Sequence, residues 1–340
     1  MNVGGTPDRA RRPRGVIGCL TAGFEMLTHS LHVVGVPVVL DLILWLGPRV
    51  SIGPLLQGFV DLLGSQPPSD PEIAGQIDQA ARLLQQFGDR FNLLSVLGGV
   101  PMFQVPSLLA RRAPAGSPLG ARQELPLSSV LALIPWWGTL ALIGLVLGFF
   151  YLNEIAHQVG DDGSGTSGGG VVPSGERPEE AGEGIWAGVS KFLRFLAFAL
   201  GLMAVGFIVF PLWVLLVALG ASIAQPLGVL MWVAGVGLLS YTALHLVFVV
   251  PGLLLGERGL LRAIGESVML SHFSLSSVLG FVLLAVVIYE GLGYAWALPA
   301  SDSWAMLIGI VGHAFVGTGL TGAAFVFYRD RVTAGDQFLE

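Results

Sequence analysis

The most informative scarcity in this 340-residue sequence is charge, because Asp, Glu, Lys and Arg together make up 12% of the residues. A soluble domain carries about 25% charged residues, so this chain cannot cover a globule of its size in water. Hydrophobic residues reach 53%, and the net charge of −6 gives no field that would attract anionic polymers. The composition excludes a soluble enzyme, a disordered protein and a nucleic-acid binder, and it indicates an integral membrane protein.

Cysteine is nearly absent as well. Cys19 is the single cysteine, which excludes an internal disulfide bond and a cysteine metal cluster. Four residues separate it from Arg14. A lipoprotein signal needs an apolar region of about 7–15 residues before its cysteine, so we expect no lipid anchor there.

Long apolar segments are abundant. A membrane-spanning helix needs about 20 mostly apolar residues. Five segments meet this requirement, at about 127–152, 192–219, 227–255, 276–299 and 304–328. A sixth segment, 31–47, is shorter and contains Pro37, so it needs residues from the helix before it. The predicted fold class is all-α: a polytopic membrane protein with six transmembrane helices in three hairpins.

Apolar residues spaced three and four apart precede three of these spans. One such face begins at Ile17, a second at Ile185 and a third at Leu260. This spacing is typical of amphipathic helices. We therefore predict three in-plane amphipathic helices, each followed by an antiparallel pair of spans.

Arginine placement predicts the orientation. Basic residues cluster in the 1–15 tail, at the start of the third span, around Arg258 and after the sixth span. The short opposite loops, 220–226 and 300–303, contain no Lys or Arg. Because basic loops stay in the cytoplasm, we predict a multi-pass protein of the bacterial cytoplasmic (inner) membrane. Both termini, including the tail at 332–340, would then be cytoplasmic.

The segment 48–125 would lie outside the cytoplasm. Asp70, Pro71 and Glu72 form a helix start, with a capping Asp, a Pro at the first position and an acid in the first turn. The apolar pattern extends this helix to about residue 91. Residues 91–110 are apolar but interrupted by glycines and prolines, so either a re-entrant or an interfacial arrangement is open. We expect a small helical extracytoplasmic cap.

The remaining boundaries follow from a change in composition. Residues 158–184 are rich in Gly, Ser, Glu and Pro, which cannot bury a core, so we predict a flexible cytoplasmic linker. Before it, an in-plane helix and the first span occupy 16–47, and the second span occupies 126–157. After it, a four-span bundle occupies 185–331.

Four ionisable residues remain deep in the predicted spans: Asp41, His245, Glu290 and His313. Such residues are costly in a bilayer and are candidates for function. Glu290 and His313 each lie nine residues from the outer ends of adjacent spans, roughly 13 Å deep. Asp41 lies six residues below the outer end of its span. We predict one intramembrane polar cluster of Asp41, Glu290 and His313, which is either a proton or cation site or a structural pair holding the last hairpin.

His245 is a secondary polar residue at a different depth. It lies roughly 27 Å from the outer end of its span, too far from His313 for the two histidines to share a haem iron. The sequence shows neither a catalytic triad nor a zinc-protease motif, and its glycine runs lack the Lys of a phosphate-binding loop. We expect no catalytic residues, no metal site and no cofactor.

The stretch Gly259-Leu260-Leu261-Arg262-Ala263-Ile264-Gly265-Glu266-Ser267 precedes a span. It resembles a feature of several uncharacterised bacterial six-span families, including YciC-like proteins and the membrane domain attached to some glycerophosphodiester phosphodiesterases. In these families an amphipathic helix with a basic residue and a Ser lies before each pair of spans. The resemblance covers about the last 150 residues, and it implies the six-span fold without transferring a catalytic residue. The segments 44–49 and 105–108 look like family-specific signatures with no activity attached.

Two functional interpretations follow. The first is an integral membrane protein without a catalytic site, which acts in interaction or scaffolding or handles lipid. The second is a transporter or permease subunit whose path lies near Asp41, Glu290 and His313. The expected partners are the lipid bilayer and a membrane protein or a second copy of the chain, with no nucleic acid.

Overall fold

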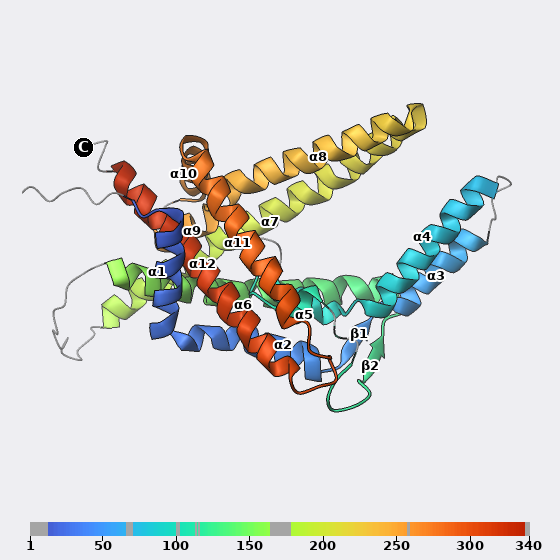
Figure 1. Ribbon diagram of the computed structural model, residues 1–340, viewed down its shortest axis with the longest axis horizontal. Helices are drawn as coiled ribbons and strands as arrows, with labels where there is room; N and C mark the ends of the chain where they lie inside the picture. The colour runs from blue at the N-terminus through green and yellow to red at the C-terminus, as the bar shows by residue number, and fades with distance from the viewer. Residues whose placement is uncertain are drawn as a thin grey trace, which may run out of the picture. The chain divides into compact units, whose positions relative to one another are not determined.

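The computed structural model describes residues 13–65, 71–99, 103–112, 114, 116–163, 178–256 and 259–336. These residues are almost entirely helical (Figure 1). The elements before residue 128 are α1 (Val16–His29), the 3-10 turn η1 (Leu31–Val34), α2 (Gly35–Leu46), β1 (Arg49–Ser51), α3 (Gly53–Gly64), α4 (Pro71–Arg90), the 3-10 turn η2 (Leu93–Gly98), α5 (Leu108–Arg111) and β2 (Glu124–Pro126). The later elements are α6 (Val130–Gly163), α7 (Pro178–Ile223), α8 (Gln225–Leu246), α9 (Val249–Leu255), α10 (Leu260–Phe273), α11 (Leu275–Trp296) and α12 (Met306–Asp336).

Five helical segments are long and apolar enough to cross a membrane. They are Val130–Gly160, Trp186–Ile223, Gln225–Leu255, Leu275–Trp296 and Met306–Ala334. A sixth span exists if α1 and the helical residues Leu31–Leu46 form one broken span. The all-α polytopic membrane fold predicted from the apolar segments is therefore confirmed.

The in-plane helix expected before the third span is not a separate element. α7 continues without a break from Pro178 to Ile223, whereas α10 and α11 are separated at Ser274. The apolar face that begins at Ile185 has the same period as the span that follows. No residue between them ends the helix, and the two segments form one.

The observed helices also extend into both ends of the predicted linker at 158–184, because α6 ends at Gly163 and α7 begins at Pro178. Residues 164–177 lie outside the described residues, as do residues 1–12 and Arg258, on which the predicted orientation partly depends. Asp70 also lies outside them, and the helix that was expected to follow it begins at Pro71.

The chain divides into two compact units: unit 1 comprises 1–30, 153–286 and 319–340, and unit 2 comprises 31–152 and 287–318. In unit 1, α7 and α8 pack side by side as a hairpin (Figure 1), and α10 packs against α8 and α9. The Phe327 ring of α12 stacks with Phe248, with centroids 5.2 Å apart, and also contacts Phe281. Tyr328 Oη donates a hydrogen bond to Glu266 Oε2 at 2.9 Å, which joins α12 to α10.

Unit 2 contains the segment between the first two predicted spans. Within the segment predicted to form the cap, α3 and α4 pack against each other (Figure 1), and its extracytoplasmic position stays a prediction. It also contains a two-stranded parallel sheet that was not predicted, in which Arg49 pairs with Glu124 and Ser51 with Pro126. This sheet brings both ends of the cap together.

Candidate functional site

Asp41 is fully buried in α2, and its carboxylate caps the start of α5. It accepts hydrogen bonds from the Ser107 hydroxyl and from the backbone N–H groups of Leu108 and Leu109, the latter two at 3.0 Å. Ser107 Oγ in turn accepts from the N–H of Ala110 at 3.0 Å. The first N–H groups of a helix have no partner within the helix, and Asp41 and Ser107 supply those partners here.

Glu290 of α11 forms an ion pair with Arg111, the last residue of α5. The two side chains are 45% and 44% exposed, so the pair lies at the surface of unit 2. The Arg111 guanidinium also lies over the Tyr289 ring, 5.1 Å from its centroid. Arg111 is therefore held by a carboxylate and an aromatic face from the same helix.

His313 of α12 is buried, with 3% of its surface exposed. Its ring lies 4.6 Å from that of Tyr289, and its Nε2 has no hydrogen-bond partner in the part of the chain that the structure describes. Gly293 lies beside His313, and the neighbouring Arg112 donates to the Gly293 carbonyl at 2.8 Å. Asp41 and Glu290 both contact α5, and Tyr289 lies beside both Arg111 and His313. The role of Asp41, Glu290 and His313 as one functional cluster stays a prediction.

His245 belongs to unit 1, at the end of α8. Its Nδ1 lies 2.9 Å from the Tyr241 carbonyl, and its own carbonyl accepts a hydrogen bond from Ser267 Oγ at 2.7 Å. Ser267 Oγ also accepts from the Phe248 N–H at 3.2 Å. These contacts hold the break between α8 and α9. Among the described residues, no group of three His, Cys, Asp or Glu side chains is placed to hold a metal ion.

The sequence pattern did not reveal a polar pocket of about 830 Å³ in unit 2, formed by the cap and the loop between α11 and α12. Its charged lining residues are Arg49, Asp89, Arg90, Arg122, Glu124 and Asp302. Three are basic and three are acidic, and the pocket also exposes the backbone around Gly116 and Gly120. The segment 44–49, which stood out in the sequence without an assigned role, ends at one of these arginines.

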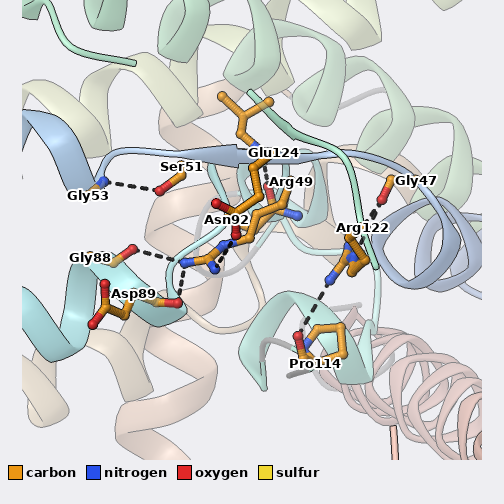
Figure 2. Close-up of polar contacts among 11 residues, drawn as sticks. Gly47, Arg49, Ser51, Gly53, Gly88, Asp89, Asn92, Pro114, Arg122 and Glu124 are labelled. Carbon is orange, nitrogen blue, oxygen red and sulfur yellow. Dashed lines mark hydrogen bonds and ion pairs between the residues drawn. The ribbon is translucent and has the colours of Figure 1, made fainter. Parts of the chain in front are cut away.

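Backbone carbonyls hold two of the arginines in place (Figure 2). Arg49 Nη2 donates to two backbone carbonyls in the last turn of α4, those of Gly88, at 3.0 Å, and Asp89. Arg49 Nη1 forms an ion pair with Glu124 at 3.2 Å. Arg122 donates to the carbonyls of Leu44 and Gly47 at the end of α2. A guanidinium at a helix C-terminus satisfies carbonyls that lack partners and interacts favourably with the helix dipole.

The two guanidinium groups are close enough to affect each other. Burial lowers the pKa of Arg122, the positive charge of Arg49 lowers it further, and Glu124 opposes both effects. Arg49 Nε is buried without a hydrogen-bond partner in the described residues. This part of the pocket therefore holds positive charge, while Arg49 Nε itself is buried beneath the pocket surface.

Two tryptophans, Trp45 and Trp304, lie close to the pocket in unit 2. Trp45, at the end of α2, donates from Nε1 to the Ser301 carbonyl at 2.6 Å, and its ring contacts Trp304 edge to face at 5.6 Å. The N–H of Gly116 donates to Ser301 Oγ at 3.0 Å. The cap therefore contacts the loop between α11 and α12. Trp45 is fully buried, whereas Trp304 is 57% exposed, and exposed tryptophans are typical of membrane interfaces.

No protein-family model, no curated protein and no solved structure matches this chain. Its function must therefore be argued from its own residues.

Proposed function

We propose that this protein is a lipid-handling component of the bacterial cytoplasmic membrane with no catalytic site of its own. In this proposal both termini lie in the cytoplasm and the cap lies on the outer surface. The observation that carries it is the polar pocket, which combines six ionisable side chains with the Trp45–Trp304 contact at one end of unit 2. Most small-molecule sites are lined mainly by apolar side chains, whereas this pocket is lined mainly by charged and polar residues, which suits a charged headgroup rather than an apolar ligand.

The two acids of the predicted spans, Asp41 and Glu290, support a role without catalysis. Asp41 uses both carboxylate oxygens to hold α5, and Glu290 is paired with Arg111. Neither carboxylate is left as a free base. Buried polar groups are normally hydrogen-bonded for structural reasons, and these two residues fit that rule.

Native mass spectrometry of the full chain, released from mild detergent, tests the lipid-handling role. We expect phospholipid to remain bound to the wild-type protein after delipidating washes. Recovery of a folded protein that retains no lipid under any mild condition would contradict the proposal.

The proposed orientation has a separate test. A Gln123→Cys substitution in a Cys19→Ser background places one thiol beside β2, at an exposed position. We expect an impermeant maleimide added to intact spheroplasts to label it. A thiol that is labelled only after lysis would place the cap in the cytoplasm.

A transport function is the second candidate, because His313 is buried with an unused ring nitrogen close to the Arg111–Glu290 pair. A buried imidazole in such a place can transfer a proton. Proton flux in proteoliposomes, followed with an enclosed pH-sensitive dye, tests it. Flux in the wild type that is lost in stable His313→Ala and Glu290→Gln variants would favour transport over lipid handling, whereas no flux in any of the three would remove this candidate.

A further inference from the structure

The charges of the polar pocket specify a class of ligand. It is lined by three guanidinium groups and three carboxylates, so its formal charge is balanced. A purely anionic ligand would bring its charge near Asp89, Glu124 and Asp302. A purely cationic ligand would likewise meet Arg49, Arg90 and Arg122. Repulsion between like charges costs binding free energy. A ligand that carries one positive and one negative charge can place each of them beside groups of the opposite sign.

The lining groups differ in how they are used within the protein. Arg49, Arg122 and Glu124 make hydrogen bonds or ion pairs that fix their positions. The side chains of Asp89, Arg90 and Asp302 make no hydrogen bond or ion pair within the part of the chain that the structure describes. The pocket thus combines a fixed part with three charged groups that are available to a ligand.

Arg90 suits a phosphate, because its exposed guanidinium lines the pocket and makes no hydrogen bond or ion pair among the described residues. Arg49 and Arg122 add positive charge nearby, although backbone carbonyls already accept from most of their N–H groups. Arginine presents several N–H donors to phosphate oxygens in a planar arrangement. The free carboxylates of Asp89 and Asp302 suit a primary ammonium group, which donates three hydrogen bonds.

We propose that the polar pocket binds a molecule in which a phosphate and a primary ammonium group are a few bonds apart, the chemistry of an aminoalkyl phosphate. The proposal rests on the lipid-handling role proposed above and names its ligand class. The same chemistry occurs in the headgroup of phosphatidylethanolamine and in free phosphoethanolamine. The nearby Trp304 favours the lipid, because its side chain is largely exposed and exposed tryptophans concentrate at membrane interfaces.

The test uses the full chain in mixed micelles with equal amounts of phosphatidylethanolamine and the anionic phosphatidylglycerol, and native mass spectrometry counts the bound lipids. We expect the wild type to retain more phosphatidylethanolamine. Asp302→Asn should lower this preference about three- to fivefold while bound lipid persists, because one exposed charge partner is lost. Arg90→Gln should weaken the retention of both lipids.

Matched controls lie on the same helix as Arg90 but outside the pocket. Asp78→Asn and Arg82→Gln make the same changes in charge on α4, and neither residue lines the pocket. We expect both variants to keep the wild-type preference. A wild type that prefers phosphatidylglycerol or shows no preference would overturn the proposal, as would an Asp302→Asn effect no larger than that of Asp78→Asn.

A second arm distinguishes the source of the ligand and separates this proposal from the proposed function. Calorimetric titration of phosphoethanolamine into protein in phosphatidylglycerol nanodiscs measures binding of the free compound. Asp302-dependent binding of phosphoethanolamine, with no lipid retained in the first arm, would support the ligand class and refute lipid handling. Lipid retained without any headgroup preference, together with no phosphoethanolamine binding, would refute the ligand class and leave lipid handling in place.

Discussion

The α7–α8 hairpin of unit 1 and the segment 91–112 of unit 2 are both apolar. They differ in how the hydrogen-bonding groups of their backbones find partners. In α7 none of the most apolar window is buried within the protein, and the helix makes its own backbone hydrogen bonds. The described residues of 91–112 are largely buried, yet they form only the short elements η2 and α5. Non-helical backbone groups need hydrogen-bond partners from elsewhere in the protein, and in this segment side chains supply several of them.

The difference shows where this protein places its buried polar side chains. Asn92 accepts from the Leu94 N–H at the start of η2, and Ser107 and Asp41 serve α5 in the same way. Ser267 serves the break between α8 and α9 in unit 1. In both units, therefore, several buried polar side chains accompany interruptions of helices, whereas His313 and Thr318 lie within the unbroken α12. An ionisable residue in a span is a functional candidate by default, but for Asp41 the contacts explain its burial.

Removing the Asp41 carboxylate should have the largest effect on this comparison. In Asp41→Ala, the Ser107 hydroxyl and the N–H groups of Leu108 and Leu109 lose their acceptor. We expect the free energy of unfolding to fall by about 3 kcal/mol, because each unpaired buried donor costs about 1–3 kcal/mol. An SDS titration followed by tryptophan fluorescence measures the loss.

Asp41→Asn is the milder companion variant, because its amide oxygen can still accept from α5. We expect a smaller loss of stability, and this variant remains informative if Asp41→Ala does not accumulate. Stability equal to that of the wild type in both variants would show that the carboxylate does not hold α5.

Glycines test the same contrast through packing. A Cβ atom at Gly144 of α6 would lie 2.9 Å from the Val96 carbonyl oxygen and 3.1 Å from that of Leu97, whereas one at Gly201 of α7 would meet nothing within 4 Å. We expect Gly144→Ala to lower the free energy of unfolding by about 1–3 kcal/mol, because the buried segment must shift. Gly201→Ala should cause no loss, since Ala has the higher helix propensity. The same SDS titration compares them, and equal effects would contradict the tight packing of η2 on α6.

The Ser267 hydroxyl tests whether a polar side chain also stabilises a helix break in unit 1. In Ser267→Ala, the Phe248 N–H loses its acceptor and the His245 carbonyl loses a donor. We expect a loss of about 1–2 kcal/mol in the free energy of unfolding. The control is Thr242→Ala, because Thr242 Oγ1 only donates to the Leu238 carbonyl of its own helix, at 2.9 Å. If the two variants unfold at the same SDS concentration, the break between α8 and α9 does not depend on Ser267.

Helices whose signals lie within their own residues could be predicted from the sequence. The five spans follow from the length of their apolar segments, and the helix that begins at Pro71 follows from its start signal. The pairing of β1 with β2 could not be predicted, because two three-residue strands carry no clear alternation and lie over 70 residues apart. Nor did the sequence show that α7 is unbroken, since an amphipathic helix and a span share one period.

For the candidate sites, the sequence likewise shows single residues but not the partners that the fold brings to them. Asp41, Glu290 and His313 could be singled out because each is an ionisable residue in an apolar segment. The partners that define their surroundings, such as Ser107 for Asp41 and Arg111 for Glu290, come from a segment that is distant in sequence. Arg49 and Arg122 resembled other arginines of the cap, and only the fold brings them into one pocket.

The Arg111–Glu290 pair should contribute least, because both side chains are nearly half exposed. A double-mutant cycle of Arg111→Gln, Glu290→Gln and the double variant gives the coupling free energy, which we expect to be about 0.2–1 kcal/mol for a hydrated pair. Arg111→Gln alone should cost more than Glu290→Gln, because it also removes the contact with the Tyr289 ring. Arg111→Lys, which keeps the charge, controls for that contact. A coupling well above 1 kcal/mol would mean that the pair lies in a water-poor environment.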